Sequence, residues 1–479
     1  MNAPVIWIIF PILSAILLYL FRQYSRLVKI IGILICLFLA LLAWQLPIGS
    51  PISLGPWPSL PAVTLSETLT VFGRQFILND SSRSFLLIIY LGTASWVIGA
   101  SVINVSRLFI PVSLLIAGLL TAAISVEPFL YAAFFIQITI LSCVPLLSPP
   151  GIRTPRGALR FLIFQTIGMI LLIFSGWSVT NVELNAINPT IVYRTTIILI
   201  LGFAMTISVF PFSTWIPMVL EETNPYMAAF VIFTLPEIVS LFAFNTFSRY
   251  SWLYTSLTIQ ISFIVIGLVM VVGSGIWAIF QNNLGRIFGY AVIIEIGLFL
   301  ITLGQELANI QGNQPEAANL IAQLPLAAFF FALLLPRGLT LALWAFSLAL
   351  IKIKSNQLDF KSTQGIGFTF PVAGLSLIVA SLSLAGFPLL SGYPIRAVVG
   401  ASLSQTSIIL ALSTLIGYFG LVLATLRSIS NLYTNPDKQA WKISETRPQL
   451  ILLISGCLII FFVGMFPQVF LYGLEAIFP

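Results

Sequence analysis

The 479-residue sequence has no histidine and only three cysteines, and both shortages limit its chemistry. Cys36, Cys143 and Cys457 lie singly inside apolar segments, without the CxxC spacing of zinc, iron–sulfur or disulfide sites. The lack of histidine argues against haem ligation by His and against most metal sites. No nucleotide-binding loop and no nucleophile with a neighbouring base is present either. We therefore expect no catalytic centre, no bound cofactor and no metal in this chain.

Charged residues are also scarce, at 7% of the chain, whereas hydrophobic residues make up 59%. Apolar segments of about 18 residues or more, long enough to cross a bilayer, recur from end to end. Soluble domains do not have this composition. The net charge of +7 does not indicate nucleic acid, because the basic residues are scattered singly between the apolar segments. The sequence predicts an all-α polytopic membrane protein in a lipid bilayer.

The apolar segments predict fourteen transmembrane helices. They lie near 3–21, 28–46, 82–104, 108–126, 128–147, 159–176, 194–220, 225–248, 252–281, 287–304, 321–351, 367–403, 407–427 and 449–467. The region 47–81 is rich in Pro, Ser and Gly, and it predicts a hairpin or an irregular cap on one surface.

Prolines inside these segments predict helix breaks, because a proline lacks the N–H that would bond the carbonyl four residues upstream. We expect breaks at Pro211 in the seventh segment, Pro236 in the eighth, Pro336 in the eleventh and Pro388 in the twelfth. Lipid cannot satisfy the carbonyls that such breaks free, so the breaks are expected to face protein or a water-filled cavity.

The basic residues predict the orientation. With the N-terminus outside, 15 of the 21 Lys and Arg fall in cytoplasmic connections, among them Arg22, Arg26, Lys29 and Arg107. The positive-inside rule therefore predicts that both termini are extracytoplasmic. We expect the location to be a bacterial plasma membrane.

Four charged residues lie within the predicted segments and away from their ends: Glu237, Glu295, Arg337 and Arg396. An ionisable side chain in hydrocarbon is costly and is a functional-site candidate by default. For the two acids we favour a place on an ion path. For the two arginines an alternative stays open, because long side chains near helix ends can extend to the membrane surface.

Two further acids, Glu221 and Glu222, lie at a predicted cytoplasmic turn just before Asn224 and Pro225. Glu222 is kept as a candidate on the ion path. For Glu221 we favour a solvated charge near the start of the next helix, where the helix dipole stabilises anions.

The seventh segment (FAMTISVFPFSTWIP) and the twelfth (LSLAGFPLLSGYPIRAVVG) are both interrupted by proline and small residues. Matched interrupted helices are typical of inverted-repeat transporters, whose ion path lies at the breaks. Five segments is an odd number, so segments 4–8 and 9–13 predict two inverted five-helix repeats. The predicted division is 1–107, 108–248, 252–428 and 429–479.

Three stretches resemble the antiporter-like membrane subunits of respiratory complex I (NADH:quinone oxidoreductase) and of multi-subunit Na⁺/H⁺ antiporters. VFPFSTWIP at 209–217 is similar to the family's aliphatic-Pro-x-His-x-Trp-Leu-Pro motif. AIFQNNLGRIFGYAVIIEIG at 278–297 and LAGFPLLSGYPIR at 384–396 resemble two further family motifs. The resemblance covers nearly the whole chain, and it implies proton or sodium translocation together with other membrane subunits of a complex.

The departures from the family pattern affect its charged axis. The resemblance places the family's Glu–Lys pair at Gln137 and Thr206, its further lysines at Glu237 and Leu341, and its twelfth-segment Lys or Glu at Arg396. An amide and a hydroxyl cannot titrate near neutrality, and an arginine stays protonated.

Two functions therefore remain. In the first, the chain is an ion-translocating subunit, either of a redox-driven complex or of a multi-subunit Na⁺/H⁺ antiporter. In the second, it is a translocation-inactive scaffold of such a complex.

Overall fold

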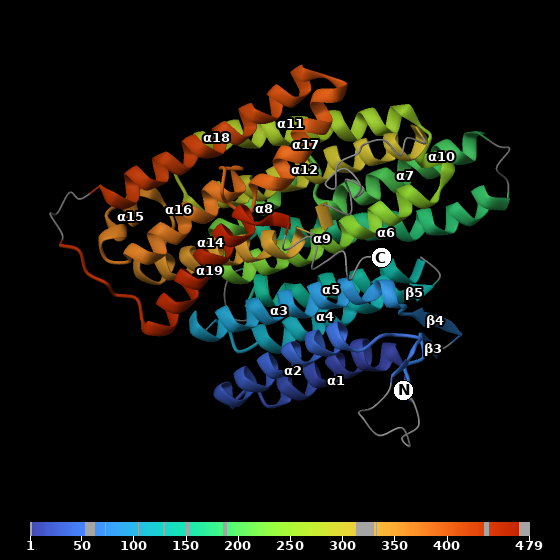
Figure 1. Ribbon diagram of the computed structural model, residues 1–479, viewed down its shortest axis with the longest axis horizontal. Helices are drawn as coiled ribbons and strands as arrows, with labels where there is room; N and C mark the ends of the chain where they lie inside the picture. The colour runs from blue at the N-terminus through green and yellow to red at the C-terminus, as the bar shows by residue number, and fades with distance from the viewer. Residues whose placement is uncertain are drawn as a thin grey trace. The chain divides into compact units, whose positions relative to one another are not determined.

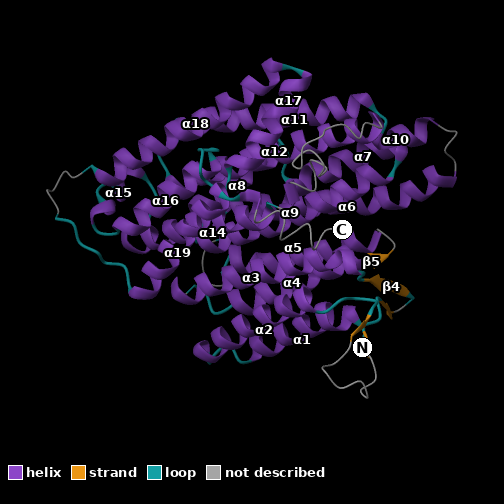
Figure 2. Cartoon of the chain, viewed as in Figure 1, coloured by secondary structure: helices purple, strands orange, loops and turns teal. Residues whose placement is uncertain are grey.

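The computed structural model describes residues 2–52, 63–71, 73–103, 105–127, 130–149, 154–184, 189–312, 330–331, 333–434 and 440–468 (Figure 1). These residues are overwhelmingly helical (Figure 2). The chain forms two compact units: the first comprises 1–152, 165–202 and 469–479, and the second comprises 153–164 and 203–468. The predicted division into four parts by repeats stays a prediction.

The first unit contains a bundle of five helices, preceded by a π-helical turn at Val5–Ile9. The helices are α1 (Phe10–Leu20), α2 (Ser25–Gln45), α3 (Arg83–Ile103), α4 (Phe109–Ser125) and α5 (Leu130–Leu147). Two more helices, α6 (Arg156–Leu184) and α7 (Pro189–Ile207), contribute residues to both units.

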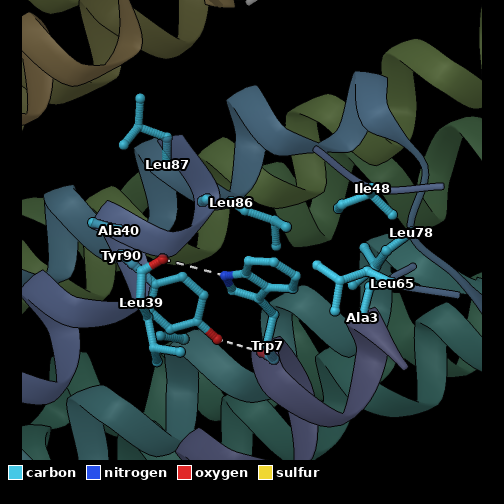
Figure 3. Close-up of a cluster of buried hydrophobic side chains, with 12 residues drawn as sticks. Ala3, Trp7, Leu39, Ala40, Ile48, Leu65, Leu78, Leu86, Leu87 and Tyr90 are labelled. Carbon is cyan, nitrogen blue, oxygen red and sulfur yellow. Dashed lines mark hydrogen bonds between the residues drawn. The ribbon is translucent and has the colours of Figure 1, made fainter. Parts of the chain in front are cut away.

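A buried aromatic pair organises the core of the first unit (Figure 3). The indole of Trp7 is fully buried, and its Nε1 donates a hydrogen bond to the carbonyl of Leu39 at 3.2 Å. The hydroxyl of Tyr90 donates to the carbonyl of Trp7. Both buried polar atoms are satisfied, so the aromatic rings add packing without an unpaired group.

The polar region between α2 and α3 forms strands, as the prediction of a hairpin required. β3 (Thr68–Val71) and β4 (Arg74–Ile77) are antiparallel, and β5 (Val126–Glu127) pairs with β4. β1 (Pro51–Ile52) pairs with β2 (Val63–Thr64), and residues 53–62 between them lie outside the described part. Gly73, in the β3–β4 turn, has φ +73°, a conformation that glycine adopts without strain.

The second unit is built around α12 (Leu284–Gly312). Its other helices are α8 (Trp215–Glu222), α9 (Pro225–Arg249), α10 (Ser251–Tyr254), α11 (Leu257–Ile279), α14 (Leu334–Ser355), α15 (Phe360–Thr363), α16 (Pro371–Leu384), α17 (Tyr393–Thr406), α18 (Ile408–Tyr433) and α19 (Arg447–Met465). In α12, 94% of the most apolar stretch is buried, the highest share among the candidate spans of the described residues. A helix so enclosed can hold a charge away from lipid.

Ten helices of the described residues are long and apolar enough to cross a membrane, or eleven when the bent pair Phe360–Phe368 and Pro371–Leu384 counts as one span. Three shorter apolar helices, Val5–Leu20, Phe109–Ser125 and Tyr131–Leu147, also coincide with predicted segments. The number fourteen and the inversion of the two repeats stay predictions.

The four prolines differ in their effect on the helices. Pro211 and Pro388 lie in breaks, between α7 and α8 and between α16 and α17. In contrast to the predicted break at Pro236, α9 continues through this residue, because neighbouring protein tolerates one missing backbone bond. Pro336 is the third residue of α14, where the backbone N–H has no partner within the helix in any case. Phe330 and Phe331 are helical and Leu333 lies in a turn, so the eleventh segment is interrupted just before Pro336.

Candidate functional site

The break between α16 and α17 begins with a left-handed residue. Gly386 has φ +79°, and the N–H of Phe387 donates to the carbonyl of Leu382 at 3.0 Å. Phe387 is the second residue after the C-cap Ala385, and its bond reaches a carbonyl five residues earlier in the chain. This is the Schellman pattern of helix ends. Pro388 follows and cannot extend the helix.

The break between α7 and α8 has the same local pattern. Ser208 takes the left-handed conformation, with φ +70°, and the N–H of Val209 donates to the carbonyl of Ala204 at 2.8 Å. The break is closed by a neutral bond, from the indole Nε1 of Trp215 to the hydroxyl of Ser208 at 2.9 Å. The likeness of the two predicted breaks therefore extends to their backbone hydrogen bonds.

A buried charge cluster lies beside the second break. Glu295 of α12 contacts Arg337 of α14 and Arg396 of α17, and all three residues are at most 5% exposed. Oε2 of Glu295 lies 3.5 Å from Nη1 of Arg337, while Oε1 accepts a hydrogen bond from Nη2 of Arg396. Three of the predicted candidates thus form one site.

Backbone and aromatic groups hold the two arginines. Nη1 of Arg396 donates to the carbonyl of Gly392 at 2.8 Å, and its Nη2 also donates to the carbonyl of Leu384. The guanidinium of Arg337 lies over the ring of Phe330, 3.7 Å from the centroid, where cation–π attraction stabilises it. Neither arginine extends to a surface, so the snorkelling alternative is wrong for both.

Three hydroxyl groups continue the polar site into the break. The Oγ1 of Thr340 lies 3.0 Å from Oγ of Ser391, which lies 3.0 Å from Oγ of Ser383. The hydroxyl of Ser383 also accepts from the N–H of Gly392 at 3.1 Å. Sequence reasoning missed these residues, although hydroxyls next to an interrupted apolar helix were a usable signal.

Polar side chains also follow one face of α14 away from the cluster. Arg337, Thr340, Trp344 and Ser347 are spaced by three or four residues, so they share a side of this buried helix. Nε1 of Trp344 is buried, and no residue in the described part of the chain accepts a hydrogen bond from it. At the end of α14, Nζ of Lys352 donates to the carbonyls of Thr223 and Glu221 at 2.6 and 3.2 Å.

The two acids at the end of α8 each have a partner. Oε2 of Glu221 lies 2.6 Å from Nε of Arg286, and the Glu221 side chain is 28% exposed, so this partly solvated charge has an ion-pair partner that the prediction did not include. Arg286 belongs to α12, so the two partners are far apart in the sequence and their pairing was not predicted. Oε2 of Glu222 accepts from the N–H of Gly157 at 2.8 Å, near the start of α6, where an anion is stabilised. Its place on an ion path stays a prediction.

The predicted pair in the first repeat is divided between the units. Thr206, in the second unit, is fully buried and donates to the carbonyl of Phe203 at 3.3 Å. Gln137 is in the first unit, and its Oε1 is buried with no donor among the described residues. Their proximity stays a prediction. The backbone of Glu237 lies in α9, and its side chain is outside the described part.

One buried acid was missed altogether. Glu306 of α12 is 6% exposed, three turns beyond Glu295. Nearby, Nε2 of Gln260 donates to the carbonyls of Tyr254 at 2.6 Å and Leu307 at 3.4 Å. The tenth segment was predicted to end at 304, whereas the helix continues to 312, so Glu306 was assigned to a loop.

The cluster has one group that can exchange a proton. Glu295 is titratable, whereas an arginine stays protonated under ordinary conditions. With both arginines charged and Glu295 ionised, the cluster carries a net charge of about +1, and burial makes the pairing strong. Protonation of Glu295, or arrival of a cation, weakens its hold on the arginines.

The sequence model of the family described as "NADH:quinone oxidoreductase/Mrp antiporter, TM" matches residues 158–424. NADH-quinone oxidoreductase subunit N of Pelagibacter ubique is 23% identical over 403 residues, 79% of this chain and 80% of that one. NADH-ubiquinone oxidoreductase chain 5 of Elephas maximus is 25% identical over 244 residues, which are 50% of this chain but only 37% of the elephant protein.

Two solved structures are similar in fold. A chain of the archaeal membrane-bound sulfane sulfur reductase superposes with a TM-score of 0.80 at 17% identity, covering 98% of this chain and 96% of that one. A chain of the Mrp complex from Dietzia sp. gives a TM-score of 0.76 at 14% identity, covering 98% and 95%. Because the family model spans more than half of the sequence, this integral, multi-pass membrane protein belongs to the NADH:quinone oxidoreductase/Mrp antiporter transmembrane family.

Proposed function

We propose that this chain is an antiporter-like subunit of a multi-subunit membrane complex of the complex I type, and that it takes part in moving H⁺ or Na⁺ across the membrane. Subunits of NADH-quinone oxidoreductase and of an Mrp complex are among its relatives in sequence and fold. The partners are then other membrane subunits, and electron transfer to quinone takes place elsewhere in the assembly. The positive-inside rule supports extracytoplasmic termini.

The observation that carries this proposal is the position of Glu295. Its carboxylate is 5% exposed and bridges arginines from two helices, one of which starts at a helix break. An acid with two alternative partners can change partner as its charge changes. Each change moves a buried charge relative to α14 and α17, and the hydroxyls of Thr340, Ser391 and Ser383 offer adjacent oxygens to water or a cation.

A translocation-inactive scaffold is the second candidate, and a specific observation favours it. Gln137 and Thr206 cannot titrate, and the one acid of the cluster is held by two permanent charges. In that case the cluster only locks the broken helix in place, and the chain serves its partners as a membrane scaffold.

Coupled ion transfer by the intact complex in sealed vesicles distinguishes the two. Glu295→Gln keeps the size of the side chain and removes its charge. For a translocating subunit we expect fewer ions transferred per turnover, with the electron-transfer rate of uncoupled membranes retained.

The matched control is Glu445→Gln, which makes the same change at another buried acid. Oε1 of Glu445 accepts from the backbone N–H groups of Val372 and Ala373 at 2.9 and 3.1 Å, and an amide oxygen can replace it there. An ion yield that is unchanged in Glu295→Gln, in a fully assembled complex, would favour the scaffold.

A further inference from the structure

A pocket in the first unit is unrelated to the charge cluster. It lies where α1 ends and α2 begins, against the connection from α3 to α4. Its lining includes Arg22, Ser25, Lys29, Ser106 and Arg107. The enclosed part of the pocket is small, about 20 Å³, and the pocket opens at the surface, so a phosphate group would bind at its mouth.

The lining is strongly basic. Arg22, Lys29 and Arg107 contribute three positive charges, and no acidic side chain is among the lining residues. Nζ of Lys29 donates to the carbonyl of Ser101 at 3.0 Å, which fixes the ammonium at the wall. The guanidinium of Arg22 lies 4.5 Å from the centroid of the Tyr19 ring. Two serine hydroxyls, from Ser25 and Ser106, add hydrogen-bonding groups suited to an oxyanion.

The acids of this region lie at the other end of the helices. The only acidic residues of segment 1–152 are Glu67, Asp80 and Glu127. Asp80 precedes α3, whereas the pocket lies after its last residue, and the 21 residues of α3 span about 30 Å. This exceeds the screening length of about 8 Å at physiological salt, so these acids do not neutralise the pocket.

Exposed apolar side chains lie next to Arg22 in the sequence, interspersed with the exposed Gln23 and Arg26. Phe21, Tyr24 and Leu27 are 54%, 64% and 51% exposed, and they flank Arg22 in the sequence. A soluble anion gains nothing from such a rim, whereas the acyl chains of a lipid do. Basic pockets at the ends of transmembrane helices are suited to anionic lipid headgroups.

We propose that this pocket binds a phosphate group and that membrane phospholipid supplies it. The guanidinium groups of Arg22 and Arg107 contact the phosphate oxygens, Lys29 adds a fixed charge at the wall, and the acyl chains lie along Phe21 and Leu27. This site is independent of ion translocation, so it stands or falls separately from the proposed function.

Photo-crosslinking tests the proposal in membranes that contain the assembled protein. The probe is phosphatidic acid with a photoreactive group in one acyl chain, and the readout is its incorporation into this chain. Unlabelled phosphatidic acid should compete, whereas diacylglycerol, which has the same chains without phosphate, should not. Inorganic phosphate is the third competitor: if it displaces the probe at concentrations similar to those of the lipid, the phosphate site stands but a soluble phosphate is its source.

Charge removal gives the second arm. One basic residue near the membrane surface contributes about 1 kcal/mol, or about fivefold in affinity. We therefore expect Arg22→Gln with Arg107→Gln to weaken probe binding about 25-fold. The matched control is Arg26→Gln, which removes an exposed charge four residues from Arg22 in the sequence, at a position that does not line the pocket.

Lysine variants distinguish the loss of charge from misfolding. Arg22→Lys with Arg107→Lys keeps both charges and should retain most of the binding. Equal losses in Arg26→Gln and in the pocket variants would overturn the proposal, because the attraction would then come from diffuse surface charge. Equal competition by diacylglycerol would overturn it too.

Discussion

The two helix breaks of the second unit share a backbone pattern and differ in chemistry. Each begins with a left-handed residue, Ser208 or Gly386, followed by a Schellman hydrogen bond. The first is closed by a neutral bond between Trp215 and Ser208. The second is closed by Arg396, whose guanidinium binds two backbone carbonyls and the carboxylate of Glu295. The same backbone geometry can therefore accommodate either an uncharged lock or a charged, switchable one.

Under the proposed function, the difference predicts where ion transfer is concentrated. An indole and a hydroxyl exchange no charge near neutrality, so the first break can position water but cannot carry a charge by itself. The second break has an acid within reach of two arginines. We therefore expect substitutions at the second break to have large effects on stability and ion transfer, and equivalent substitutions at the first break to have small ones.

Removing the charge at the second break should have the largest effect on stability. Arg396→Met leaves Glu295 with Arg337 at 3.5 Å as its remaining cationic partner, and leaves the carbonyls of Leu384 and Gly392 without this donor. Breaking a buried ion pair on one side costs about 3–5 kcal/mol. Unfolding in mixed detergent micelles measures the loss. The double variant with Glu295→Gln should be less destabilised than the sum of the two single variants.

Crowding the second break should have the next largest effect. A Cβ on residue 392 would lie 1.9 Å from the carbonyl oxygen of Ser383, so Gly392→Ala must displace backbone and with it the hydrogen bond that Arg396 donates to the Gly392 carbonyl. We expect a loss of about 1–3 kcal/mol, typical of overpacking. The control is Gly400→Ala in α17, where no atom lies within 4 Å of the added Cβ. This variant should be neutral or slightly stabilising, and equal losses in both would refute the packing argument.

Removing the neutral lock should have the smallest effect. Trp215→Phe keeps a ring against Phe161, whose centroid lies 4.8 Å away, and removes the donor to Ser208. One neutral hydrogen bond contributes about 1 kcal/mol. The same unfolding measurement should therefore find Trp215→Phe considerably more stable than Arg396→Met. A loss of stability as large as that of Arg396→Met would show that the neutral bond and the charged cluster stabilise their breaks equally.

The sequence predicted the breaks at Pro211 and Pro388 because proline and small residues interrupt otherwise apolar segments. It failed at Pro236, since the effect of a proline depends on its position within the helix and on the surrounding protein. Burial of Glu295 was predictable from its apolar neighbours. Its partners were not, because α12, α14 and α17 meet only through the tertiary fold, at separations of 42 and 101 residues along the chain.

The pairing of Glu221 with Arg286 was missed for the same reason, since 65 residues separate them. Glu306 was missed because the end of an apolar helix is poorly marked when a few polar residues remain within it. Composition thus determines which residues are buried, whereas the identity of charge partners depends on helix packing.

The most direct test compares coupled ion transfer in four variants of the intact complex: Glu295→Gln, Glu237→Gln, Gln137→Ala and Thr206→Val. The account predicts that Glu295→Gln lowers the number of ions transferred per electron clearly, while Gln137→Ala and Thr206→Val change it little. Glu237→Gln tests whether the acid of α9 belongs to the same path. If Gln137→Ala abolishes transfer as strongly as Glu295→Gln, or if all four variants leave the yield unaltered, ion transfer does not depend specifically on Glu295 at the second break.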